Sequence, residues 1–345
     1  MQKAVLYEKK SNNAVKCRAC SWYCDIAEGS TGICGIRENI KGDLYLLTYG
    51  KPVAVHIDPI EKKPLFHFLP GTEIFSFGTY GCNFACEFCQ NWDISQTPRE
   101  LKNQRKKLYA LIDSCENFPP EKIVEYCVKN KITSIAYTYN EPAIFFEYAY
   151  DTARLAHEAG IKNVFVSNGF ESKEAIEKIA PYLDANNIDL KAWSSEFYKK
   201  ICHAKIDPVK ENIKRFYDAG VWIEITTLLI PGHNDSDEDL KHIAEFLLNI
   251  SPDIPWHVTA FHPDYKMLDT PPTPAKTLIR AYKIGKSAGL NYVYTGNIWG
   301  LEGENTYCPK CGALLIKREG MSAVEINLKT GACNMCGFKI KGVWT

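Results

Sequence analysis

The sequence has no excess of charge of either sign and no long apolar run. Lysine plus arginine and aspartate plus glutamate both number 41 in a chain of 345 residues, so we expect no strongly basic face for nucleic acid or anionic lipid. No stretch reaches the roughly eighteen apolar residues of a membrane span, and the opening MQKAVLYE lacks the apolar core of a secretion signal. These absences predict a cytoplasmic protein without a membrane or nucleic-acid partner.

Cysteine, in contrast, is abundant. Of the 14 cysteines, all but three fall into groups within residues 17–34, 82–89 and 308–336. Disulfide frameworks are typical of small secreted domains, whereas this chain is long and has no secretion signal, so metal binding explains the groups better. Cys115, Cys127 and Cys202 stand alone, and we interpret them as buried or incidental thiols.

The central cysteine group lies in one short loop, GTYGCNFACEFCQNW at residues 78–92. Three thiolates from one loop can hold three corners of a cubane iron–sulfur cluster and leave the fourth iron open to a substrate or cofactor. The alternative is a zinc knuckle, but structural zinc prefers four protein ligands and no fourth cysteine lies nearby. The predicted ligands are Cys82, Cys86 and Cys89.

The two terminal groups predict closed metal sites. The amino-terminal one occupies a segment too short for an apolar core, which favours a module held together by zinc or, as the alternative, by a second iron–sulfur cluster. Its ligands would be Cys17, Cys20, Cys24 and Cys34. The carboxyl-terminal group has two Cys-x2-Cys-Gly knuckles with a β ribbon expected between them, which is typical of a tetrahedral zinc or iron site. Its ligands would be Cys308, Cys311, Cys333 and Cys336.

Between the terminal modules, apolar strand segments alternate with helical segments. The alternation predicts an α/β fold, a partial or nearly closed TIM-like (β/α) barrel. We expect three domains: 1–72 with the first module and its strands, 73–300 with the barrel, and 301–345 with the last module. Strands are expected at 44–50, 53–57, 73–78, 134–138, 163–167, 185–190, 222–230, 256–261 and 292–295. Helices are expected at 120–130, 143–159, 173–180, 208–219, 237–249 and 274–288.

Polar or turn-forming residues follow successive predicted strands. In a parallel barrel the chemistry lies at the carboxyl ends of the strands. Each of these short segments alone is ordinary turn chemistry, but their recurrence at successive strand ends indicates a site. An amide and a carboxylate there can bind an amino group, and a lysine can meet a carboxylate. The candidates are Asn140, Glu141, Ser167, Asn168, Asp189, Lys191, Ile230 and His262.

The cysteine loop and the strand ends carry a family resemblance. The pattern C-x3-C-x-φ-C, with Phe88 as the aromatic residue, closely resembles the signature of the radical S-adenosylmethionine (SAM) superfamily. Residues 73–263 resemble the pyruvate formate-lyase activating enzymes of that superfamily. The resemblance implies a 4Fe–4S cluster on the cysteine loop, whose open iron binds SAM, and reductive cleavage of SAM to a 5′-deoxyadenosyl radical.

The same resemblance implies roles for single residues. Asn140 and Glu141 would contact the SAM amino group, and Lys191 and His262 would contact its methionine and ribose portions. The remaining strand-end residues, with Tyr80 and Phe88 of the loop, would complete the SAM site.

The flanking segments narrow the resemblance. The first cysteine module, DPIEKKPL at 58–65, FHPDYK at 261–266 and GENTYCP at 303–309 resemble the radical SAM protein of the AmmeMemoRadiSam system. This resemblance implies AmmeCR1 and Memo proteins as partners and an electron donor such as ferredoxin or flavodoxin. The substrate stays open between a protein glycine, a small molecule and another protein. The alternative function is a zinc-dependent scaffold or binding protein without radical chemistry.

Overall fold

The structure, a computed structural model, describes residues 1–344. The chain divides into two compact units. Unit 1 comprises Met1–Ile57, Ile74–Asn186 and Asp207–Val221, and unit 2 comprises Asp58–Glu73, Asn187–Ile206 and the chain from Trp222 onward. The three domains expected from the sequence, 1–72, 73–300 and 301–345, have other boundaries than these units, and that division stays a prediction.

The main sheet contains the seven strands that the sequence predicted between residues 73 and 296. The strands are β8 (Glu73–Gly78), β9 (Ser134–Tyr137), β10 (Lys162–Ser167), β11 (Ala185–Asp189), β12 (Trp222–Leu229), β13 (Trp256–Ala260) and β14 (Val293–Gly296). Their hydrogen-bonded order follows the chain, β8-β9-β10-β11 and β11-β12-β13-β14, and the boundary between the units falls inside β11. β7 (Ala54–Pro59) is the neighbour of β8.

The strands of unit 1 form a parallel sheet because they are apolar on both faces. All residues of β9 and all but the first of β8 are buried, as expected for parallel strands covered by helices on both sides. β8 pairs with β9 and β9 with β10 in parallel, in register at Phe75, Ile135 and Asn163. The carboxyl ends of these strands therefore meet at one edge of the sheet.

Helices alternate with the strands as predicted. They are α4 (Pro120–Asn130), α5 (Phe146–Glu158), α6 (Lys173–Ile179), α8 (Asp207–Asp218), α9 (Asp237–Leu248) and α10 (Ala275–Ala288). Ser172 and Ser236 cap α6 and α9, each accepting a hydrogen bond from a backbone N–H of the first turn. Shorter helical segments are η1 (Ile60–Lys62), η2 (Pro142–Phe145), η3 (Ala180–Tyr182), α7 (Ser195–Phe197), η4 (Tyr198–Cys202) and η5 (Glu302–Glu304).

The amino-terminal module, within unit 1, is built from two small sheets. One has the order β1-β6-β5 and the other the order β2-β3-β4. The strands are β1 (Gln2–Lys3), β2 (Tyr7–Lys9), β3 (Val15–Cys17), β4 (Asp25–Ile26), β5 (Arg37–Ile40) and β6 (Asp43–Leu46). Residues 96–115, for which the sequence indicated no clear structure, contribute α2 (Thr97–Glu100) and α3 (Arg105–Asp113), preceded by α1 (Trp92–Ser95).

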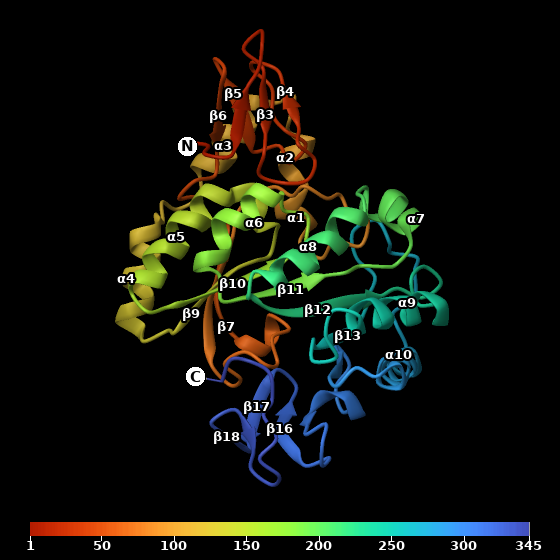
Figure 1. Cartoon of the computed structure of the whole chain (residues 1–345). Helices are drawn as coiled ribbons and strands as arrows, with labels where there is room; N and C mark the ends of the chain where they lie inside the picture. Colours follow the sequence, from red (N-terminus) through yellow and green to blue (C-terminus); the bar gives the residue numbers. More distant parts are fainter. Residues whose placement is uncertain (345) are drawn as a thin grey trace. The chain divides into compact units, whose positions relative to one another are not determined.

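The carboxyl-terminal module, within unit 2, is the predicted β ribbon. It contains the sheet β15-β16-β17 and the hairpin β18-β19, drawn in blue in Figure 1. The strands are β15 (Thr306–Tyr307), β16 (Leu314–Glu319), β17 (Ser322–Ile326), β18 (Leu328–Lys329) and β19 (Ala332–Cys333). Cys308 and Cys333 belong to its buried core, together with Leu315, Ile316 and Ile340. Across residues 1–344, no helix is both long and apolar enough to cross a membrane.

Candidate functional site

The cysteine loop leaves the carboxyl end of β8 where the backbone is tightly packed. A Cβ at Gly78 would lie 2.4 Å from the Thr138 carbonyl oxygen at the end of β9. Gly81 has φ +99°, and a Cβ there would lie 2.8 Å from the Cys34 carbonyl oxygen. Both positions therefore require glycine. Of the three loop cysteines, Cys86 is buried and the other two are half-buried.

Two asparagines from neighbouring strand ends hold this loop. The Asn140 side chain accepts a hydrogen bond from the Thr79 backbone N–H at 3.1 Å and donates to the Gly81 carbonyl oxygen at 2.9 Å. Asn168 Nδ2 donates to Asn83 Oδ1 at 2.8 Å. Asn140 thus holds the backbone before Cys82, and Asn168 holds the side chain of Asn83, the residue after it.

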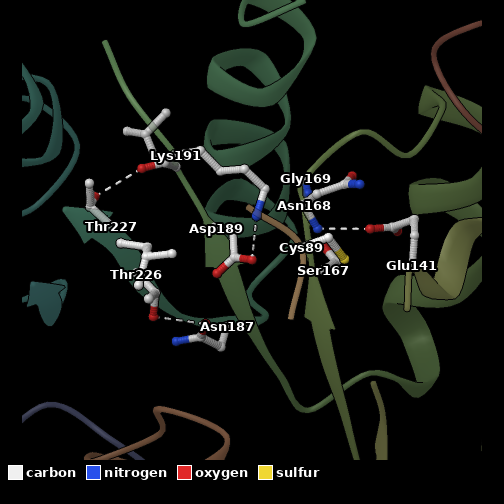
Figure 2. A network of polar contacts seen from close by, with 12 residues as sticks. Cys89, Glu141, Ser167, Asn168, Gly169, Asn187, Asp189, Lys191, Thr226 and Thr227 are labelled. Carbon is white, nitrogen blue, oxygen red and sulfur yellow. Dashed lines mark hydrogen bonds and ion pairs between the residues drawn. The ribbon is translucent and has the colours of Figure 1, made fainter. Parts of the chain in front are cut away.

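Glu141 joins the ends of β9 and β10. Its Oε2 accepts a hydrogen bond from the Asn168 backbone N–H at 2.7 Å, drawn as a dashed line in Figure 2. Its Oε1 accepts from the Ala143 N–H at 3.0 Å and caps η2. Ser167 Oγ accepts from the Gly169 N–H at 3.0 Å. The Glu141 carboxylate is thus held between the ends of β9 and β10.

Three residues that the sequence analysis did not predict also hold the cysteine loop. Arg99 donates to the carbonyl oxygens of Cys82 and Phe84, at 3.2 and 3.3 Å, and Gln96 donates to Phe84 O at 3.2 Å. Trp22 Nε1 donates to the Asn83 carbonyl oxygen at 2.9 Å. The bonding between these distant segments has no local sequence signal.

The two aromatic residues predicted in the loop lie differently. Phe88 is buried. Tyr80 is half-buried and lines a pocket of about 450 Å³, together with Pro52, Val53 and Cys115. Tyr80 therefore faces a space large enough for a ligand, whereas Phe88 is enclosed by protein.

The remaining predicted residues belong to unit 2, where Asp189 and Lys191 lie side by side (Figure 2). Lys191 Nζ lies 2.8 Å from an Asp189 carboxylate oxygen. Asn234 links the strand ends, because its Nδ2 donates to the Lys191 carbonyl oxygen at 2.6 Å and its Oδ1 accepts from the Ile230 N–H at 2.6 Å. His262 is exposed just beyond β13. The structure brings Asp189, Lys191 and Ile230 together through Asn234, a residue the sequence did not indicate.

The carboxyl-terminal cysteines have the geometry of a single-ion site. Cys308 and Cys336 sulfurs are 3.7 Å apart, as are those of Cys311 and Cys333, and all four lie within 4.8 Å of one another. Four sulfurs bound tetrahedrally to one zinc at about 2.3 Å would be separated by about 3.8 Å. The structure therefore fits a tetrahedral ion here.

Matching knuckles frame this site. Gly312 N–H donates to Cys308 O and Gly337 N–H to Cys333 O, both at 2.9 Å, and both glycines have φ above +70°. The left-handed backbone at each glycine turns the chain back around the sulfurs. The two halves of the site are thus built alike.

The other two cysteine groups are gathered but less compact. Burial raises the pKa of the Cys82 thiol far above its ordinary value, and the charges of Glu141, Cys86 and Cys89 raise it further. Burial likewise raises the pKa of Cys20, with added contributions from Cys17, Cys24 and Cys34. The sulfurs in each group are thus close enough to influence one another. Three soft thiolate donors on one loop fit a cubane cluster that keeps one iron without a protein ligand.

The comparisons with known proteins agree with this site. Residues 77–247 match the family model of the Radical SAM superfamily, a segment that begins in β8, contains the cysteine loop and ends in α9. The chain therefore belongs to the radical SAM superfamily and has its α/β fold.

Three proteins illustrate the similarity. "Uncharacterized protein MJ0808" of Methanocaldococcus jannaschii is 45% identical over 343 residues, 99% of each chain. "Putative glycyl-radical enzyme activating enzyme MJ1632" of the same organism is 29% identical over 187 residues, 53% of this chain and 65% of the relative. A solved domain of the pyruvate-formate lyase-activating enzyme from Bacteroides vulgatus is 21% identical with a TM-score of 0.40, covering 47% of this chain and 98% of that domain.

Proposed function

We propose that this protein is a radical SAM enzyme that binds a 4Fe–4S cluster at Cys82, Cys86 and Cys89 and reductively cleaves SAM. One observation carries the proposal: the three-cysteine loop lies at the carboxyl end of β8, inside the segment that matches the Radical SAM superfamily. When bound, the cluster and SAM would supply a one-electron cleavage of the SAM C–S bond, giving methionine and a 5′-deoxyadenosyl radical.

The residues of unit 1 would hold the loop and receive SAM. Asn140 holds the loop backbone at Thr79 and Gly81, and Asn168 holds the Asn83 side chain. Glu141, whose carboxylate lies between the ends of β9 and β10, suits the SAM amino group. Tyr80, Phe88 and Ser167 complete this part of the proposed site.

The residues of unit 2 would contribute the other contacts. Lys191, half-buried and paired with Asp189, suits the SAM carboxylate, and Asp189 suits a hydroxyl group or a cation. His262 and the Ile230 backbone are the proposed contacts for the ribose and adenine. We also infer that the strands form the partial barrel of this superfamily.

The substrate and partners extend the proposal. The 29% identical relative is named for activation of a glycyl-radical enzyme, which supports hydrogen abstraction from a protein glycine, with modification of a small molecule or of another protein as the alternatives. We propose AmmeCR1 and Memo proteins as partners, on the resemblance of the flanking segments, and a ferredoxin or flavodoxin as electron donor. A cytoplasmic location suits an oxygen-sensitive cluster. No comparison favours the alternative of a zinc scaffold.

The test is SAM turnover by the anaerobically reconstituted, reduced protein. We expect 5′-deoxyadenosine and methionine in equal amounts, measured by liquid chromatography with mass detection. The Cys82→Ala/Cys86→Ala/Cys89→Ala variant should form neither, whereas Cys127→Ala, at a lone buried thiol of α4, should match the parent protein. Equal product from the triple variant and the parent, or none from a parent that carries its full iron and sulfide, would refute the proposal.

A further inference from the structure

The three cysteine groups of this chain differ in how far apart their sulfurs lie. The carboxyl-terminal sulfurs form a compact set with separations of 3.7 Å in two pairs. Within residues 1–344, this is the one group of three or more potential ligand side chains whose ligand atoms all lie within 4.8 Å of one another. The amino-terminal cysteines and the cysteine loop are therefore both more widely spaced than the ligands of a single ion.

Wider spacing is what a cubane cluster requires. Each thiolate of a 4Fe–4S cluster binds a different iron, so its sulfurs are separated by the width of the cluster, whereas sulfurs on one zinc lie about 3.8 Å apart. The amino-terminal group offers four thiols, one for every iron. Cys17, Cys20 and Cys34 are at most 7% exposed, and Cys24 is half-buried with its sulfur turned toward Gly32.

We propose that Cys17, Cys20, Cys24 and Cys34 bind a second 4Fe–4S cluster, with a protein ligand on every iron, in place of the zinc ion that the sequence favoured. Because no iron is left open, this cluster has no position for SAM. The chain would then carry two cubane clusters of different ligation and one tetrahedral ion.

The proposed cluster module packs directly on the cysteine loop, within the same unit. The carbonyl oxygen of Cys34 lies against Gly81, where an added Cβ would approach it to 2.8 Å. Trp22, between Cys20 and Cys24, donates its indole N–H to the carbonyl oxygen of Asn83. The module therefore touches the loop on both sides of Cys82.

The module also touches the segment that follows β10. Cys20 forms a β-bridge with Glu171, and the Ser21 N–H donates to Phe170 O at 2.9 Å. The Phe170 ring packs between Trp22 and Phe84, at ring distances of 5.3 and 5.1 Å. Metal ligation of Cys20 and Cys34 would thus fix the backbone on which the loop rests. This positioning role rests on the proposed function, whereas the second cluster itself does not.

The test uses a variant in which the cysteine loop cannot contribute iron. The full chain with Cys82→Ala/Cys86→Ala/Cys89→Ala is purified and reconstituted without oxygen, and its iron, acid-labile sulfide and zinc are counted. We expect about four irons and four sulfides per chain, as in a single cubane, and a paramagnetic resonance signal after reduction. Adding SAM should leave this signal unchanged. Because SAM turnover is not measured, failure of the proposed function would not affect this result.

A second set of substitutions tests whether the amino-terminal cysteines bind this iron. Cys20→Ala/Cys24→Ala, which leaves only two thiols in this group, should lose most of this iron when placed in the triple variant, whereas Cys115→Ala in the same background should keep it. Circular dichroism confirms that each variant is folded. Two zinc ions and no iron in the triple variant, two irons in place of four, or iron that survives Cys20→Ala/Cys24→Ala would each overturn the assignment.

Discussion

Replacing Glu147 by glutamine should strongly destabilise the attachment of the amino-terminal module. Arg37 of β5 and Glu147 of α5 form a two-pronged ion pair, with both nitrogen–oxygen distances 2.8 Å and both side chains 2% exposed. Arg37 also donates to Ile144 O, and the Val5 N–H donates to Glu147. Glu147→Gln leaves the guanidinium charge buried without a counter-charge, which costs about 3–5 kcal/mol.

The assay is urea unfolding of the anaerobic protein, followed by circular dichroism. A matched control on the same helix is Glu158→Gln, whose pair with Arg154 is exposed and should contribute less than about 0.5 kcal/mol. The double replacement Arg37→Met/Glu147→Leu should recover much of the loss, because apolar residues of similar size need no counter-charge. A loss below about 1 kcal/mol for Glu147→Gln would refute the reasoning.

Three further predictions concern single positions. Gly81→Ala should cost more than about 1 kcal/mol and lower the iron content, because φ is +99° and Cys34 blocks the Cβ, whereas Gly232→Ala, at φ +76° but with open space for the Cβ, should cost less and keep the iron. Burial raises the pKa of Glu171 from 4.5 to about 7, so its contribution to stability should fall as pH rises through this window, and Glu171→Gln should remove that contribution in pH-resolved unfolding. The same pH profile for Glu171→Gln and the parent protein would contradict this prediction. Cys311→Ser should remove the single tetrahedral ion, measured by mass spectrometry of metals, without loss of iron–sulfur absorbance; retention of that ion would contradict the assignment.

Much of the fold could be predicted because its signals are local. Continuous apolar runs such as residues 73–78 and 134–137 are typical of buried parallel strands, and they appear as β8 and β9. The Cys-x2-Cys-Gly knuckles predicted a compact metal site, and the structure gathers those sulfurs within 4.8 Å. The predicted ribbon between the knuckles is confirmed as β16 and β17.

The hydrogen-bond partners of the predicted polar residues were harder to predict. Asn140 and Asn168 were expected at the cofactor, yet their side chains bond to Thr79, Gly81 and Asn83. These partners are separated from them by 59 to 85 positions, so only the assembled sheet brings them together. Strand-end position can be read from a sequence, but the direction of a side chain depends on tertiary contacts.

The contacts between the amino-terminal module and the cysteine loop could not be predicted from the sequence either. The spacing of Cys17, Cys20, Cys24 and Cys34 indicated a metal site, and it allowed either zinc or an iron–sulfur cluster. The contacts of Trp22 with Asn83 and of Cys34 with Gly81 arise between segments that share no pattern. Sulfur spacing in three dimensions, absent from the sequence, favours the cluster.

The most direct test of the central claim is electron paramagnetic resonance of the reduced protein with and without SAM. The Cys20→Ala/Cys24→Ala variant keeps only two thiols of the first module, so its signal should come from the cysteine loop alone. We expect this variant to give a cubane signal that changes when SAM is added and disappears when Cys82, Cys86 and Cys89 are also replaced by alanine. A fully reconstituted protein whose signal SAM leaves unchanged, or that contains zinc alone, would contradict it.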